Sequence, residues 1–141
     1  MKVATEDEMA KILIVGEHPS VREFIAEELA GEGHLVVAIG NPGLIGELLT
    51  TLEPDLVLLD FLRSRMNLWR ALGEIKRRDA HLPVFTFTSY GRYKEEIRFE
   101  VMNGNGTKSF SLELLKQKVT ELLGREPIHN FERMKDHLLL P

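Results

Sequence analysis

A carboxylate closes an apolar run near the middle of the chain. Residues 56–59 are four consecutive aliphatic residues, preceded by Pro54 and Asp55 and followed by Asp60. Such an unbroken run is typical of a strand that is covered on both faces in a parallel sheet. Open α/β folds carry their chemistry at the carboxyl ends of such strands, so Asp60 is the first candidate for a functional residue.

Other polar groups also follow apolar runs. Thr88 ends the run from residue 84, and Glu17 and His18 follow the run at 11–15 after one glycine. Alone, Thr88 would be a turn or cap residue. One imidazole and two carboxylates, from His18, Glu17 and Asp60, would be a ligand set for a transition metal. The simpler interpretation of His18, which precedes Pro19, is a solvent-facing turn residue.

The composition fits one soluble domain. The chain has 141 residues and no cysteine, so disulfides, thiol nucleophiles and cysteine-bound metals are excluded. The net charge of −4 offers no general attraction to phosphate backbones, so we expect no direct contact with nucleic acid. The first ten residues are polar and acidic, and no apolar run is long enough to span a bilayer. We expect a cytoplasmic protein without membrane contact.

Apolar runs and helical patterns alternate along the chain. Predicted strands lie at 11–15, 35–39, 56–60 and 84–88. Ser20 and Glu23 form a capping box at the start of the first helix, and Asn41-Pro42 begins the second. Three helix patterns then follow, which place Trp69, Leu72 and Ile75 inward, Ile97 and Val101 on one face of residues 93–102, and Leu115 and Val119 behind Ser111.

This alternation predicts an α/β fold with three layers, a doubly wound parallel sheet between two layers of helices. A fifth strand should lie near residues 104–108, where two glycines and an asparagine are poor strand formers. We expect a flexible extension at 1–10, one domain at 11–124 and a C-terminal tail at 125–141. The apolar stripe Phe131, Met134 and Leu138 predicts a short helix in that tail, lying on its own domain or docking a partner.

The order of several short motifs resembles the receiver domain of two-component response regulators. The matching segments are Lys11–Val15, Pro19–Arg22, Pro54–Asp60, Leu82–Val84, Thr88–Gly91 and Lys108–Phe110. The resemblance covers about residues 11–124. It implies a flavodoxin-like sheet of five parallel strands in the order 2-1-3-4-5. It also implies a signalling module of the phosphorelay, not an enzyme.

The resemblance assigns roles to several residues. Asp60 matches the aspartate that accepts a phosphoryl group from a histidine kinase or phosphotransfer protein. Lys108 and Thr88 match the lysine and the hydroxyl that bind the phosphoryl group. The family holds Mg²⁺ with two acids after the first strand, the acceptor aspartate and a backbone carbonyl two residues later, which is that of Leu62 here.

The chain departs from the family at that acidic pair. The two positions are Gly16 and Glu17, followed by His18, so one carboxylate is missing. We therefore expect weak Mg²⁺ binding, or none, through Glu17, Asp60 and Leu62. Further departures lie beyond the fourth strand, where the family has an aromatic residue, an aliphatic residue and a proline at the positions of Asn105, Gly106 and Ser109.

Arg63 and Arg65 follow Asp60, where the family usually has apolar or small residues. They are either solvated loop residues or substitutes for the charge of the metal, pairing with Asp60.

Two functions follow from this comparison of motifs. The first is a receiver that accepts a phosphoryl group on Asp60 with an impaired Mg²⁺ site. The second is a phosphorylation-independent pseudo-receiver that acts as a protein–protein interaction module. In either case we expect a downstream protein partner. The surface within residues 93–124 matches the one that the family uses for dimers and partners.

Overall fold

The aliphatic residues of the central strand are completely buried, because the strand has neighbours on both sides and helices on both faces. The computed structural model describes residues 9–61, 65–91, 97–103 and 106–124. The strands of this part are β1 (Lys11–Gly16), β2 (Leu35–Ile39), β3 (Leu56–Asp60), β4 (Val84–Tyr90), β5 (Arg98–Asn103) and β6 (Gly106–Phe110). The helices are α1 (Pro19–Gly31), the 3-10 turn η1 (Pro42–Leu44), α2 (Ile45–Thr51), α3 (Arg65–Arg78) and α4 (Leu112–Leu122).

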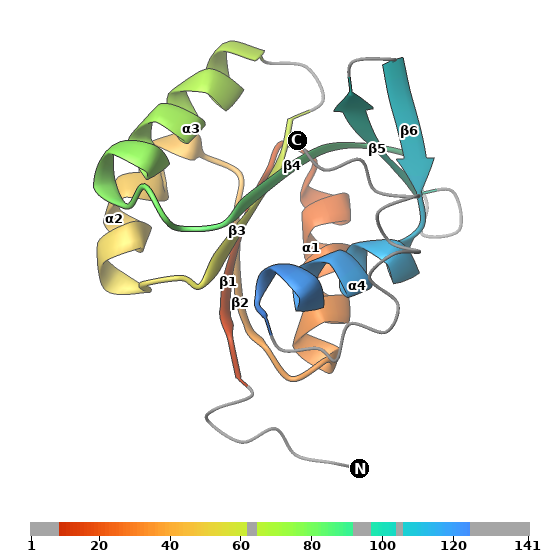
Figure 1. Ribbon diagram of the computed structural model, residues 1–141, viewed down its shortest axis with the longest axis horizontal. Coiled ribbons are helices and arrows are strands. Elements are labelled where there is room, and N and C mark those ends of the chain that lie inside the picture. The colour runs from red at the N-terminus through yellow and green to blue at the C-terminus, as the bar shows by residue number, and fades with distance from the viewer. Residues whose placement is uncertain (1–8, 62–64, 92–96, 104–105, 125–141) are drawn as a thin grey trace.

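Four of the strands form the parallel part of the sheet. The order is β2-β1-β3-β4-β5-β6, and the pairs β1–β2, β1–β3 and β3–β4 are parallel. Helices α1 and α4 cover one face, and α2 and α3 cover the other (Figure 1). The predicted fold class, a mostly parallel sheet between two layers of helices, is therefore confirmed.

Successive residues of β3 serve two separate cores. Leu56 and Leu58 pack towards α1 and α4, whereas Val57 and Leu59 pack towards α2 and α3. Side chains alternate between the two faces of a strand, so Asp60 lies on the same face as Leu56 and Leu58. The alternation decides which side chains can reach Asp60.

The outer part of the sheet differs from the prediction. The helix predicted over 93–102 is wrong where the structure describes it: β5 runs antiparallel to β4, and residues 93–96 lie outside the described residues. The alternation of buried Phe99 and Val101 with outward Arg98 and Glu100 is a strand pattern, and it prevails over the spacing of Ile97 and Val101. The segment predicted as a fifth parallel strand forms β6 from Gly106 onward, and it pairs antiparallel with β5 and not with β4; residues 104–105 lie outside the described residues.

Two predicted details of the helices are also wrong. Helix α1 begins at Pro19 after His18, whose side chain makes no capping hydrogen bond, so Ser20 is already helical and no capping box forms. Trp69 is 68% exposed, not inward. Ala71 and Ile75 define the buried stripe of α3, and Trp69 lies about 120° around the helix from Ile75.

Two other predicted helix starts, at Asn41-Pro42 and at Ser111, are confirmed. Asn41 accepts a hydrogen bond from the Gly43 amide at 2.9 Å, and the Ser111 hydroxyl accepts one from the Leu114 amide at 3.2 Å. Asn41 is the side-chain cap that the sequence predicts, and it caps the 3-10 turn η1 before α2. The cap at Ser111 was not predicted, although the helix that begins there was.

Candidate functional site at the carboxyl end of β3

Asp60 lies at the carboxyl end of β3 and is only 3% exposed. Its neighbours in the sheet are Gly16 at the end of β1 and Phe87 in β4. The carboxylate therefore lies at the carboxyl end of the parallel strands, as predicted, but it is buried.

The cover is Ser89. Its backbone amide donates a hydrogen bond to Oδ1 of Asp60 at 3.0 Å, and its hydroxyl donates one to Oδ2 at 2.5 Å. Ser89 is itself 2% exposed. One residue therefore satisfies both oxygens of the carboxylate inside the protein.

Burial raises the pKa of Asp60 to about 6, because a charged carboxylate loses its hydration there. The two hydrogen bonds from Ser89 and the charge of His18 act in the opposite direction, and the charge of Glu17 raises the pKa further. At pH 7.5 the carboxylate is mostly ionised. It is a buried anion that depends on Ser89.

Ser89 was not among the residues predicted for the site. The motif comparison pointed to Thr88, which is half-buried and lies on the other face of β4. Phe85 and Phe87 pack towards α1 and α4, and the alternation puts Ser89 on that same face, with Asp60. This two-residue period was visible in the sequence and would have identified Ser89.

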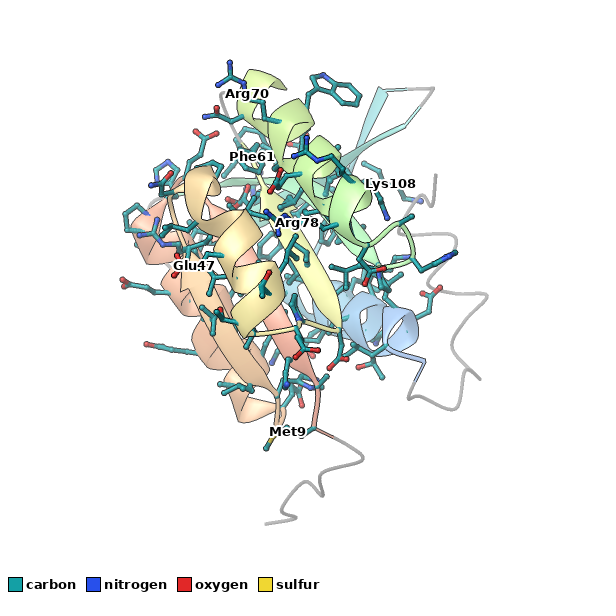
Figure 2. All side chains as sticks on the ribbon, turned by 90° about the vertical axis from the view of Figure 1, so that its left-hand side faces the viewer. Met9, Glu47, Phe61, Arg70, Arg78 and Lys108 are labelled. Atoms are coloured by element: carbon teal, nitrogen blue, oxygen red, sulfur yellow. The ribbon has the colours of Figure 1, made fainter. Side chains whose placement is uncertain are left out.

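The structure does not bring Lys108 to Asp60. Lys108 lies in β6 opposite Val101, and both β5 and β4 separate β6 from β3. Figure 2 shows Lys108 well away from Phe61, the residue that follows Asp60. Within the described residues, Lys108 takes no part in an ion pair with Asp60.

The described side chains at this end of the sheet offer few free ligands for a Mg²⁺ ion. A Cβ atom added at Gly16 would lie 3.6 Å from the Cβ of Asp60, so an acid here would face Asp60 directly, and glycine supplies no ligand. Glu17 has a buried oxygen, Oε1, without a hydrogen-bond partner, but the oxygens of Asp60 are engaged by Ser89. Mg²⁺ requires near-octahedral oxygen ligands, and one unengaged carboxylate is a poor start.

Other predicted ligands remain separate or undescribed. In the described ranges, no three acidic or histidine side chains are grouped closely enough to hold a metal, so Glu17, His18 and Asp60 form no transition-metal site. Leu62 and Arg63 lie outside the described residues, as does the side chain of Arg65.

One described arginine does reach the edge. The guanidinium of Arg22, in α1, donates to the carbonyl of Gly16 at 3.0 Å. It also passes so close to Gly40 that a Cβ atom there would lie 2.7 Å from Nη1. Arg22 therefore bridges the ends of β1 and β2 next to the position of the missing acid.

None of the described helices is long and apolar enough to cross a bilayer.

Known proteins match most of the chain. The family model for the response regulator receiver domain matches residues 12–120. A DNA-binding dual master transcriptional regulator, RpaA of Synechocystis, is 27% identical over 122 residues, which are 83% of this chain and 50% of RpaA. MtrA of Mycolicibacterium smegmatis, a DNA-binding response regulator, is 33% identical over 56% of this chain and 34% of its own. The chain spans half or less of the length of these curated relatives.

Solved structures agree with this match. The response regulator TrrA of Thermotoga maritima, in complex with Mg²⁺ and a beryllofluoride, has 26% identity and a TM-score of 0.61 over 81% of this chain and 99% of its own. A complex of the histidine kinase ThkA with TrrA also matches, with 28% identity and a TM-score of 0.58 over 82% of this chain and 99% of the matched chain.

Proposed function

Because this chain belongs to the response regulator receiver domain family of two-component signalling, we propose that it acts as a receiver module that signals through protein–protein contacts and does not need phosphorylation. The observation that carries this proposal is the closure of Asp60. Both of its oxygens are held by Ser89, and the side chain is 3% exposed.

The chemistry of phosphoryl transfer gives the physical reason. A carboxylate that attacks a phosphoryl group needs a free lone pair in line with the phosphorus and cations that neutralise the equatorial oxygens. Here each oxygen of Asp60 already accepts one hydrogen bond from Ser89, and the residue is 3% exposed, so the site would have to open before a phosphoryl group could reach it. The candidate cation, Lys108, lies in β6, which β4 and β5 separate from the strand of Asp60. The number of metal ligands is also lower than in the family, because Gly16 carries no carboxylate.

Slow phosphorylation of Asp60 is the second candidate function. It is favoured by the position of the carboxylate at the end of β3 and by a pKa of about 6, which leaves it mostly ionised at neutral pH. In this alternative Thr88 and Lys108 bind the phosphoryl group after a rearrangement of the outer strands. A weak Mg²⁺ ion is held by Glu17, Asp60 and the carbonyl of Leu62, and Arg63 or Arg65 supplies part of the missing positive charge.

The proposed partners follow from the family. Receiver domains bind histidine kinases, as in the complex of ThkA with TrrA. For this chain a histidine kinase or phosphotransfer protein, a downstream protein in the cytoplasm and a homodimer are all proposals.

The test is an amide NMR titration of the full chain with Mg²⁺ and then with Mg²⁺ plus beryllofluoride. The Ser89 amide is the reporter, because it donates directly to Asp60. We expect neither addition to shift Ser89 or Asp60 at millimolar concentration. Saturable shifts at both residues would refute the first proposal and establish the second.

A variant designed to bind Mg²⁺ serves as the positive control for an absence of shifts in the native chain. Gly16→Asp places a carboxylate beside Asp60, and its Cβ would make only ordinary contacts, 3.4 Å to the Cβ of Arg22 and 3.6 Å to that of Asp60. We expect this variant to bind Mg²⁺ with saturable shifts at Asp60. The double variant with Asp60→Asn serves as its matched control and should lose them.

A further inference from the structure

The outward face of α3 carries side chains with no role in the core. Trp69 is 68% exposed, and Arg70, Gly73 and Arg77 are exposed too. Trp69, Gly73 and Arg77 are spaced by four residues, which places them along one side of the helix. That side is opposite the buried stripe of Ala71 and Ile75.

This helix is basic in an acidic protein. It contains five basic residues and one acidic residue, giving +4, whereas the whole chain carries −4, so the remainder carries −8. Arg77 and Arg78 share one glutamate, Glu74. In the described part of the chain, Arg70 makes no hydrogen bond or ion pair, and Figure 2 shows it at one end of α3, pointing away from the fold.

Within the described residues, packing does not require a glycine at position 73. A Cβ atom added there would meet no described atom within 4 Å, although glycine inside a helix costs about 1 kcal/mol relative to alanine. Gly46 in α2 differs, because a Cβ atom there would lie 2.6 Å from Oε1 of Glu74. Gly73 instead leaves a flat gap between Trp69 and Arg77, which would let another chain approach the helix closely.

We propose that this face, made of Trp69, Arg70, Gly73 and Arg77, binds an acidic segment of a partner protein. Carboxylates of the segment pair with the two arginines, and an apolar side chain packs on the indole across Gly73. Tryptophan and arginine are the residue types that contribute most binding energy in protein interfaces. The inference deepens the proposed function, on whose protein contacts it rests, and places the contact away from Asp60.

Charge favours a protein segment over nucleic acid. A nucleic acid strand extends beyond one helix and would meet a remainder of the chain that carries −8. A short acidic peptide needs to contact only α3, where the positive charge is concentrated.

Trp69 is the only tryptophan of the chain, so its fluorescence reports directly on this face. The probe is a short peptide of glutamate and leucine, and the control peptide has lysine in place of glutamate. We expect the acidic peptide alone to move the emission to shorter wavelength with saturation. No shift with the acidic peptide, an equal shift with the lysine peptide or a saturable shift with single-stranded DNA only would each overturn the proposal. A shift that depends on protein concentration without peptide would also overturn it, since a second copy would then occupy the face.

Variants test the individual contacts by anisotropy of a labelled acidic peptide. Trp69→Ala and the double variant Arg70→Glu with Arg77→Glu should each weaken binding by roughly thirtyfold. Gly73→Leu should abolish it with unchanged circular dichroism. Arg98→Glu makes one of these two charge reversals at an exposed position on β5, and it should leave affinity within about twofold. Equal weakening by Arg98→Glu would show attraction to net charge only and refute a specific site.

The peptide-binding experiment and the beryllofluoride titration test two different proposals, and the failure of one can be distinguished from the failure of the other. Asp60→Asn should leave peptide affinity unchanged, because Asp60 lies on the face of α1 and α4 and α3 covers the other face. Loss of peptide binding in Asp60→Asn would contradict the independence of the two sites. A phosphorylated Asp60 with intact peptide binding would refute only the proposed function.

Discussion

The polar groups around Asp60 and those on the outward face of α3 differ in their environment. At the edge, a buried carboxylate receives both of its hydrogen bonds from Ser89. On α3, a guanidinium and an indole face water, and Arg70 has no ionic partner among the described residues. Groups that are satisfied internally fix the fold, whereas groups left outward are available to another molecule.

The two regions also differ in how they use glycine. Gly16 removes a ligand from the place where the receiver family has an acid, and Arg22 binds the carbonyl of that residue. Gly73 removes a side chain from an open surface. Gly16 lowers the number of possible metal ligands near Asp60, and Gly73 makes the surface of α3 more accessible. The three predictions below test this contrast.

The largest effect should come from Asp60→Asn. The folded protein holds the proton of Asp60 more tightly than the unfolded chain does, since the pKa rises from 3.8 to about 6. The contribution of Asp60 to stability is therefore fully present below pH 4 and is lost as the pH rises to 6, by up to about 3 kcal/mol. The asparagine variant lacks this loss and should be more stable than the native chain at pH 7.5.

Urea denaturation at a series of pH values measures this difference. The control is Glu23→Gln, which removes an exposed carboxylate from α1 and should leave the pH profile unchanged. A native profile that stays flat between pH 4 and 6 would contradict the burial of an ionised Asp60.

Ser89→Ala should have the next largest effect. It leaves one oxygen of a buried carboxylate without its donor, which costs about 2 kcal/mol of unfolding free energy at pH 7.5. The pKa of Asp60 should rise further, because that hydrogen bond lowers it. The matched control is the neighbouring hydroxyl: Thr88→Ala should cost clearly less, and equal losses would contradict the assignment of Ser89. The pKa is measured by NMR titration of the carboxyl carbon.

Gly73→Ala should give the smallest change, a gain of roughly 0.5–1 kcal/mol in unfolding free energy, because alanine favours the helix and the added methyl has open space. Gly31→Ala, at the C-terminal end of α1, has the same open space and should gain less, since helix ends contribute little. Thermal unfolding measures both. A destabilised Gly73→Ala would mean that the fold itself requires this glycine.

The sequence predicted the parallel half of the sheet well because apolar runs and helix caps are local signals. Residues 56–60 form the buried central strand, Asn41 caps the turn before α2, and a helix begins after Ser111, as predicted. The outer half could not be predicted in the same way. Residues around Phe99 satisfy a two-residue and a four-residue spacing at once. The strand is favoured by contacts with other segments, namely the pairing with β4 and β6 and the aromatic contacts of Phe99 with Phe87 and Phe110.

The position of Asp60 was predicted because it ends a buried strand, whereas its role as phosphoacceptor stays a prediction. Ser89 was missed because motif matching selected Thr88, one residue away, on the opposite face. The distance between Lys108 and Asp60 depends on how many strands intervene, and the position of β5 was not recognised in the sequence. Trp69 was placed inward because large apolar side chains are usually buried.

The antiparallel strands at the outer edge also bear on how the chain folds. Strands β5 and β6 are neighbours both in the sheet and along the sequence, so their pairing needs only a short loop to close. The amino ends of β1 and β3 come together across 44 residues. Closing so long a loop is entropically slower, and folding rates fall as contacts become more distant in sequence. Assembly of the β1–β3 pair should therefore limit the folding rate, with the β5–β6 hairpin formed before it.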